Sequence, residues 1–275
     1  MFKKAMVVAP PSAEFEAVIR EPLEKAFSIL WKIGFDGVEI SLLNPKNMPA
    51  KQLEKLLDNY NLEIPAFSTG LNYIHYRYSL SHPNVEKRKA AISRLKEFID
   101  LAEPLEAGVI VGLMRGKVEP EFEKEKAYNL MLESLREVCN YAEARKVKIL
   151  FEPLNRYETE LVNTVDEAIK LVDELGTGAL YLLLDTFHMN IEEPSIEQSI
   201  KKAGELIGHI HVADSNRYAP GLGHINFVEV LKALKEVGYS GYLSAEIIVK
   251  PDLETAAKIT KETLEKVEKI VFRSS

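Results

Sequence analysis

Apolar and polar positions along the chain repeat one pattern eight times. A short apolar run rich in β-branched residues is followed by a polar loop, and then by a longer stretch whose apolar positions recur at helical spacing. We therefore expect eight strands, each followed by a helix. The expected strands are residues 4–8, 37–41, 64–69, 108–112, 147–152, 180–185, 206–211 and 242–246. The expected helices are residues 21–33, 49–60, 85–102, 121–145, 164–175, 195–203, 227–237 and 253–271.

Strict alternation of strand and helix, repeated eight times, is typical of a (β/α)8 TIM barrel in the α/β class. A length of 275 residues suits one such barrel, so we expect a single domain over residues 1–275. A doubly wound open sheet is the alternative, but the first strand is not followed by the glycine-rich turn of a dinucleotide site. Gly221 and Gly223 lie late, in a loop, and lack a third glycine, so they are a weak phosphate motif.

Two connections are longer than a barrel requires. They are residues 70–83, after the third expected strand, and residues 213–226, after the seventh. In a barrel both project from the C-terminal face, where active sites are built. Three aromatic side chains in the first loop, Tyr73, Tyr76 and Tyr78, either wall a pocket or pack the loop against the barrel.

Metal-ligand residue types stand at the ends of four successive expected strands. These residues are Glu152, Asp185, His211 and Glu246. A barrel gathers strand ends on one rim, and three carboxylates there repel one another unless a cation sits among them. The pattern predicts one divalent cation, with Mn²⁺, Co²⁺, Mg²⁺ and Zn²⁺ all suited to these donors. His209 faces the same side of its strand as His211, where it either supports the site or fills the barrel.

Charge and composition narrow the class of partner. The net charge of −7 and the isoelectric point near 5.6 argue against nucleic acid or an anionic membrane as the main partner, which leaves a small molecule. A single cysteine, Cys139, excludes an internal disulfide and fits a core position. The apolar run at residues 5–9 is too short for a secretion signal and no stretch is long enough for a membrane span, so we expect a cytoplasmic protein.

Four segments resemble the D-tagatose 3-epimerase family of keto-sugar epimerases, within the xylose-isomerase-like barrel superfamily. They are FEPLNRYETELVNT (151–164), LLLDTFHMNIEE (182–193), GHIHVADSNR (208–217) and GYLSAEI (241–247). The resemblance is dense from about residue 147 to residue 247 and thin before it. It implies Glu152, Asp185, His211 and Glu246 as ligands of one divalent cation, usually manganese or cobalt, with Mn²⁺ preferred here. It further implies Glu158, His188 and Arg217 as substrate-binding residues, and a homodimer or homotetramer.

Epimerisation chemistry agrees with this resemblance. Inverting a carbon next to a ketone requires removal of an α-proton, stabilisation of the enediolate, and return of a proton to the opposite face. Two bases must therefore flank one plane. The fifth and eighth strands are three steps apart around the ring, so Glu152 and Glu246 can approach a substrate from different sides and are the expected catalytic pair.

Four basic side chains in the front half of the chain raise the question of the substrate's charge. His75 and Arg77 lie in the first long loop, and Arg115 and Lys117 follow the fourth strand. They are either surface charges or an anion subsite for a carboxylate at the far end of the substrate. The second interpretation predicts a keto-sugar acid, such as a 5-keto-gluconate, in place of a neutral ketose.

Three other functions compete with an epimerase. An aldose–ketose isomerase uses the same metal and moves a proton between neighbouring carbons. An apurinic endonuclease of this superfamily needs a histidine-rich zinc cluster and a basic face, which six histidines and a negative net charge do not favour. A non-catalytic sugar-binding protein has no chemical need for two glutamates around a metal.

Overall fold

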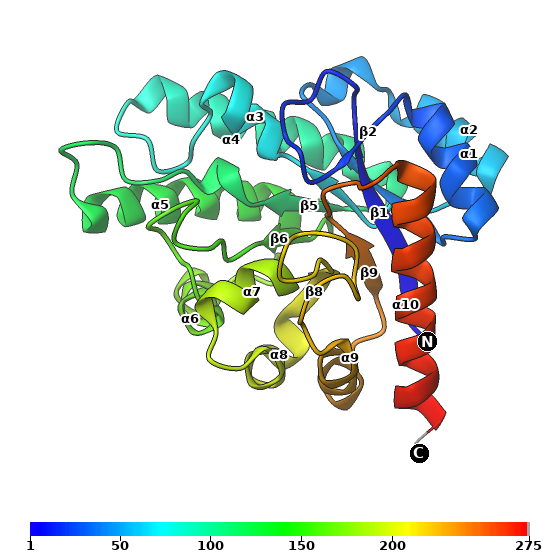
Figure 1. The fold of residues 1–275 in the computed structure, drawn as a ribbon. Coiled ribbons are helices and arrows are strands. Elements are labelled where there is room, and N and C mark those ends of the chain that lie inside the picture. The colour runs from blue at the N-terminus through cyan, green and yellow to red at the C-terminus, as the bar shows by residue number, and fades with distance from the viewer. Residues whose placement is uncertain (274–275) are drawn as a thin grey trace.

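Parallel strands form the centre of the molecule and close on themselves. The computed structural model describes residues 1–273, and in this part of the chain each barrel strand pairs in parallel with the next while the first pairs with the last. Eight described strands thus make a closed barrel, which confirms the expected fold (Figure 1). They are β1 (Lys3–Ala9), β3 (Gly37–Ser41), β4 (Ala66–Ser68), β5 (Gly108–Val111), β6 (Ile149–Phe151), β7 (Leu180–Asp185), β8 (Ile207–His211) and β9 (Tyr242–Ala245).

One strand was not expected from the sequence. β2 (Ile19–Arg20) pairs with the end of β1 outside the barrel. It has only two residues, which is too short for a periodic signal. Several barrel strands are also shorter than expected, and β6 and β9 each end one residue before the glutamate that the sequence placed at their tips.

Helices surround the barrel, and each follows a strand as the pattern predicts (Figure 1). The long ones are α1 (Leu23–Ile33), α2 (Ala50–Tyr60), α4 (Val85–Ala102), α5 (Lys124–Glu143), α6 (Val165–Leu175), α8 (Ile196–Ala203), α9 (Phe227–Glu236) and α10 (Leu253–Arg273). Short helices α3 (Gly70–Tyr76) and α7 (Thr186–Glu192) occupy connections after strands, and 3₁₀ turns η1 (Pro45–Asn47), η2 (Glu103–Leu105), η3 (Leu113–Arg115) and η4 (Gly204–Leu206) lie between longer elements. Within residues 1–273, no helix is long and apolar enough to cross a membrane.

Local sequence explains where several helices begin and end. At the start of α6, the Thr164 hydroxyl accepts a hydrogen bond from the backbone N–H of Glu167. The Glu167 carboxylate in turn accepts one from the backbone N–H of Thr164. α1 ends at Gly34, whose φ of 90° lies in the left-handed region that glycine adopts without strain. These caps satisfy backbone groups that a helix end leaves without partners.

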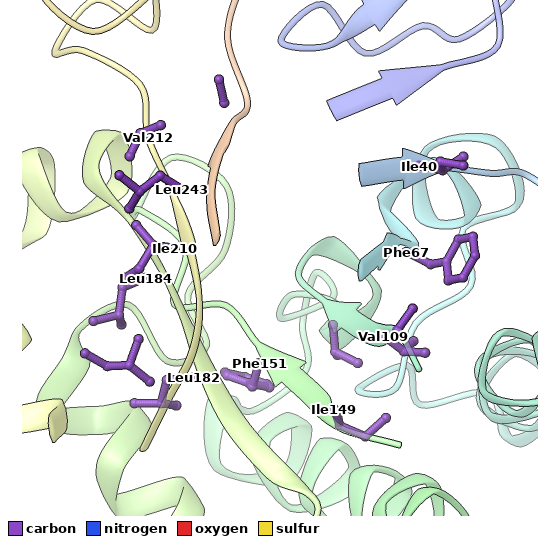
Figure 2. Packing of buried hydrophobic residues seen from close by; sticks show 14 of the residues in the cluster. Ile40, Phe67, Val109, Ile149, Phe151, Leu182, Leu184, Ile210, Val212 and Leu243 are labelled. Carbon is purple, nitrogen blue, oxygen red and sulfur yellow. The ribbon is translucent and has the colours of Figure 1, made fainter. Parts of the chain in front are cut away.

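Alternation along each strand divides the barrel into two sides. Phe67, Phe151 and Leu182 belong to the main core, which fills the space between strands and helices (Figure 2). Residues of the opposite parity, such as Leu150 and Leu183, form a separate small cluster. Since successive side chains in a strand point to opposite faces, this second cluster fills the barrel interior.

The two ends of the chain are joined by a buried ion pair. Lys4 Nζ lies 2.8 Å from Glu268 Oε2, and the backbone N–H of Phe2 donates to the other oxygen of Glu268 at 2.7 Å. Glu268 is on α10, so this contact fastens the last helix to the first strand, beside which it lies in Figure 1. Buried charges need partners of this kind because their desolvation is costly.

Candidate metal centre and active site

The alternation that fills the barrel also aims the candidate ligands inward. Glu152 lies two residues after Leu150, and Asp185 lies two residues after Leu183, so both carry the interior parity. His211 pairs directly with Asp185 on the neighbouring strand, and its other neighbour is Ser244, two residues before Glu246. Four side chains from four successive strands therefore meet at the C-terminal mouth of the barrel.

Distances confirm that the four residues form one cluster. Each offers one ligand atom, and these atoms all lie within 4.8 Å of one another. His211 Nδ1 is 3.6 Å from Glu152 Oε1 and 3.9 Å from Glu246 Oε2. All four residues are buried. A site of three carboxylates and one imidazole, drawn from rigid strand ends, has the donor set of a divalent cation centre.

Unsatisfied atoms in the cluster support the same conclusion. Among the described residues, Glu152 Oε1, Asp185 Oδ2 and His211 Nδ1 are buried and have no hydrogen-bond partner. Leaving such atoms unpaired costs roughly 1–3 kcal/mol each, and more when they are charged. A cation bound by these three atoms would satisfy all of them, so the residues present fit a metal ion.

Glu39 is a member of this region that the sequence reasoning missed. It lies on β3, and its Oε2 is 2.9 Å from His211 Nε2 and 3.0 Å from His209 Nε2. The carboxylate fixes the His211 ring with Nδ1 toward the cluster, as carboxylates do for metal-binding histidines. His209 therefore supports Glu39 and does not merely fill the barrel. The only signal was a glutamate inside the apolar run GVEIS.

Electrostatics around Glu39 follow from its burial and its two histidines. Burial by itself raises the pKa of Glu39, but His211 and His209 outweigh it and lower the pKa to about 2. Burial also acts on Glu246, whose pKa it raises to about 8 against the opposing charge of Arg217. Glu39, beside the cluster, therefore stays ionised, whereas Glu246, within it, ionises only at higher pH.

His188 and Arg217 stand over the cluster. His188 Nε2 is 3.7 Å from Asp185 Oδ2 and 3.9 Å from Glu152 Oε1, and burial lowers the pKa of this histidine well below its ordinary value. Arg217 donates to Glu246, and its Nη1 lies 3.6 Å from Asp185 Oδ2. Its guanidinium stacks 4.5 Å from the centre of the Phe187 ring. Both side chains line the mouth of the barrel beside the cluster.

A cavity of about 370 Å³ opens above the cluster. Its wall includes Glu152, Glu246, His188, Arg217 and Glu158, so five of the residues named from the sequence line one space. The remaining wall is largely apolar and comes from one strand, short helices and loops at the C-terminal ends of the strands: Phe15, Ala17, Leu71, Ile74, Ile110, Leu113, Leu154, Phe187 and Ile248. The segment around Phe15, after β1, was not expected to contribute.

The four basic residues considered for an anion subsite do not line this cavity. Arg115 is 0% exposed, which also contradicts the surface interpretation. Its guanidinium donates to the carbonyls of Gly112, Leu161 and Val162 and lies 4.1 Å from the Phe151 ring centre. It therefore holds two loops together. His75, Arg77 and Lys117 likewise lie outside the cavity wall.

The tyrosines of the first long loop pack the loop against the main core and against Arg94 of α4. Tyr76 and Tyr78 have ring centres 5.2 Å apart, and the Arg94 guanidinium lies over both. Tyr73 is buried, and Arg77 lies over its ring. None of these rings lines the described cavity, so the packing interpretation is the correct one.

Sequence comparison places the chain in a known family. The family described as xylose isomerase-like TIM barrel matches residues 27–270. The chain belongs to this family.

Several relatives of this chain are sugar epimerases. D-psicose 3-epimerase of Ruminiclostridium cellulolyticum is 35% identical over 248 residues, covering 86% of this chain and 80% of that protein. L-ribulose 3-epimerase of Methylomonas sp. is 30% identical over 222 residues, covering 81% of this chain and 77% of that protein. A solved structure of an L-ribulose 3-epimerase superposes with a TM-score of 0.85 at 26% identity, over 100% of this chain and 98% of that one. The resemblance to keto-sugar epimerases is confirmed.

Proposed function

We propose that the protein is a divalent-cation-dependent epimerase that inverts the carbon next to the carbonyl of a neutral keto sugar. One observation carries this proposal: Glu152 and Glu246 reach the same cavity from strands β6 and β9, which lie three strands apart around the barrel. Two carboxylates that approach one substrate from different sides are what an inversion by proton transfer requires.

The two glutamates divide the proton transfers. One carboxylate removes the α-proton, and the carbon–hydrogen electron pair moves into the substrate to form an enediolate. The other glutamate, in its protonated form, delivers a proton to the opposite face of the same carbon. The roles of the two glutamates exchange when the substrate has the other configuration.

Negative charge on the enediolate oxygens is met by one donor on α7 and one in the loop after β8. The His188 imidazole and the Arg217 guanidinium both line the cavity beside the glutamates, and Glu158 can accept from a substrate hydroxyl. A divalent cation held by Glu152, Asp185, His211 and Glu246 would supply Lewis-acid stabilisation of the developing charge. An oxygen-rich donor set with one imidazole favours Mn²⁺ among the candidates.

The cavity wall supports a neutral substrate. Apart from His188 and Arg217, the titratable side chains that line it are carboxylates, including Glu14 and Glu16 at the mouth. A carboxylate on the substrate would meet repulsion here, whereas the apolar wall can cover the carbon chain of a neutral sugar.

Incubation of the Mn²⁺-loaded protein with neutral ketoses and keto-sugar acids in D₂O tests this function. We expect one deuterium at the inverted carbon of a neutral ketose, detected by NMR after the protein and metal are removed. Formation of an aldose would instead identify an aldose–ketose isomerase. Faster turnover of a keto-sugar acid than of every neutral ketose would refute the proposed substrate class.

A further inference from the structure

His188 faces two N–H groups of a single residue. Its Nδ1 is 2.7 Å from Asn155 Nδ2 and 3.3 Å from the backbone nitrogen of Asn155. Both residues are buried, so water does not compete for this contact. Asn155 comes from the loop after β6, and His188 lies on α7 after β7.

The orientation of the Asn155 amide is set by a second contact. Its Oδ1 accepts from the backbone N–H of Tyr157 at 2.9 Å, which closes a tight side-chain turn. The oxygen is therefore committed to Tyr157, and the amide must present its NH₂ group to His188. Since an NH₂ group and a backbone N–H both donate, Nδ1 of the imidazole must accept.

We propose that Asn155 is a positioning residue that holds His188 in the form with its proton on Nε2, aimed into the cavity. A neutral imidazole carries one proton, so an accepting Nδ1 leaves it on Nε2. Nε2 is the atom that faces Asp185 and Glu152. The 3.4 Å approach of Arg217 Nη1 to Nε2 is then a contact between two donors and not a hydrogen bond. A substrate oxygen placed between them would accept from both.

This inference rests on the proposed function for its catalytic meaning. A donor pre-aimed at the oxygen where charge develops lowers the barrier, because no reorientation is needed during the reaction. With the proton on Nδ1 instead, the lone pair of Nε2 would face the developing negative charge and repel it. Asn155 would thus influence turnover without contacting the reacting carbon.

Nitrogen-15 NMR of the ring nitrogens in the Mg²⁺-loaded protein tests the assignment independently of activity. Mg²⁺ is used because it is diamagnetic, and His188→Gln identifies the His188 signals. We expect a protonated Nε2 and a bare Nδ1 in the unaltered protein. In Asn155→Asp, which keeps the oxygen that accepts from Tyr157, we expect Nδ1 to gain a proton because a carboxylate now faces it. A protonated Nδ1 in the unaltered protein, or a bare Nδ1 in Asn155→Asp, would overturn the proposal.

Asn163→Asp provides the matched control. Asn163 lies in the same loop, and its Nδ2 donates to the carbonyls of Leu154 and Thr159 without touching His188. We expect this variant to leave the His188 nitrogen signals unchanged. In kinetics, we expect Asn155→Ala to lower kcat by about 10²-fold, the loss typical of one transition-state donor, with a smaller change in KM. Absence of epimerase activity in the unaltered protein would refute the proposed function and leave the NMR result intact.

Discussion

His211 uses its two ring nitrogens for different purposes. Nε2 contacts Glu39, and Nδ1 faces the three other members of the cluster. Asp185 and His188 are only three residues apart, but they also have different roles. Asp185 has one oxygen inside the cluster that makes no hydrogen bond, whereas His188 lies above the cluster on α7. Replacing Asp185 is therefore expected to affect metal binding, whereas replacing His188 is expected to affect turnover.

Asp185→Asn should release the metal, while His188→Gln should retain it and lose turnover. The first variant removes a charged ligand, and the second removes a donor to the substrate. We expect at least a 10-fold weaker affinity for Mn²⁺ in the first, and about a 10²-fold lower kcat in the second. Titration calorimetry with Mn²⁺ and turnover measurements distinguish them. Equal metal affinities in both variants would contradict the division.

Glu152→Gln and Glu246→Gln should each abolish epimerisation without unfolding the protein. Each change preserves shape but removes a base, whose contribution is about 10²- to 10⁴-fold in rate. Deuterium exchange into the substrate and circular dichroism provide the two measurements. Near-full turnover in either variant, with its fold intact, would argue against the two-base assignment.

At the scale of elements, the loop after β8 is organised around one buried carboxylate. Asp214 Oδ1 accepts from the N–H groups of Ser215 and Ile225, and Oδ2 accepts from Gly221. Its backbone carbonyl accepts from Arg217, whose φ of 60° lies in the left-handed region. Asp214 therefore gathers distant parts of the loop around the turn that presents the Arg217 side chain.

Asp214→Asn should loosen this loop and weaken the use of substrate. An amide can replace only part of the carboxylate's acceptor capacity. We therefore expect the free energy that stabilises this loop to fall by about 1–3 kcal/mol, and kcat/KM to fall approximately 10-fold. Hydrogen exchange over residues 215–226 measures the loosening. Asp252→Asn serves as the control, because Asp252 caps α10, accepting from the backbone N–H of Thr255 at 2.9 Å, and does not line the cavity. Equal kinetic losses in both variants would indicate a global effect.

At the scale of the whole molecule, barrel closure concentrates like charges at one mouth. Burial raises the pKa of both Asp185 and Glu246, the latter to about 8 from an ordinary 4.5. The pKa of His211 is also raised, since the attraction of Glu39 and its other carboxylate neighbours outweighs its burial. All three shifts make the folded protein hold protons that the unfolded chain releases. Burial lowers the pKa values of His188 and His209, and these two shifts act in the opposite direction only below the ordinary histidine value of 6.5. Above that pH, stability without a cation must therefore fall as the pH rises.

Protein treated with EDTA should lose thermal stability as the pH is raised from about 7 to about 8, and Mn²⁺ should reverse the loss. At a concentration 100 times its dissociation constant, a ligand that binds only the folded state adds about 2.7 kcal/mol. Protons compete with the cation for the same carboxylates, so the increase in Tm caused by Mn²⁺ should be larger at pH 8. Calorimetric scans measure it. A larger increase at the lower pH would contradict this linkage.

Local patterns in the amino-acid sequence are enough to predict the barrel and the four residues at its mouth. The periods of apolar residues are local signals, and a closed parallel barrel is the arrangement that buries eight such units. Glu152, Asp185, His211 and Glu246 could be named because each stands at a strand end, and barrel geometry brings strand ends together.

The distant residues that complete the site could be identified only from the folded chain. Glu39 meets His211 across 172 positions of sequence, Arg115 turns inward onto backbone carbonyls, and Phe15 reaches the cavity from the loop after β1. Asn155 faces His188 only because β6 and β7 are neighbours in the barrel. Such contacts depend on side-chain direction and on the closure of the sheet, and the local periodicity of a sequence specifies neither the partner nor the distance.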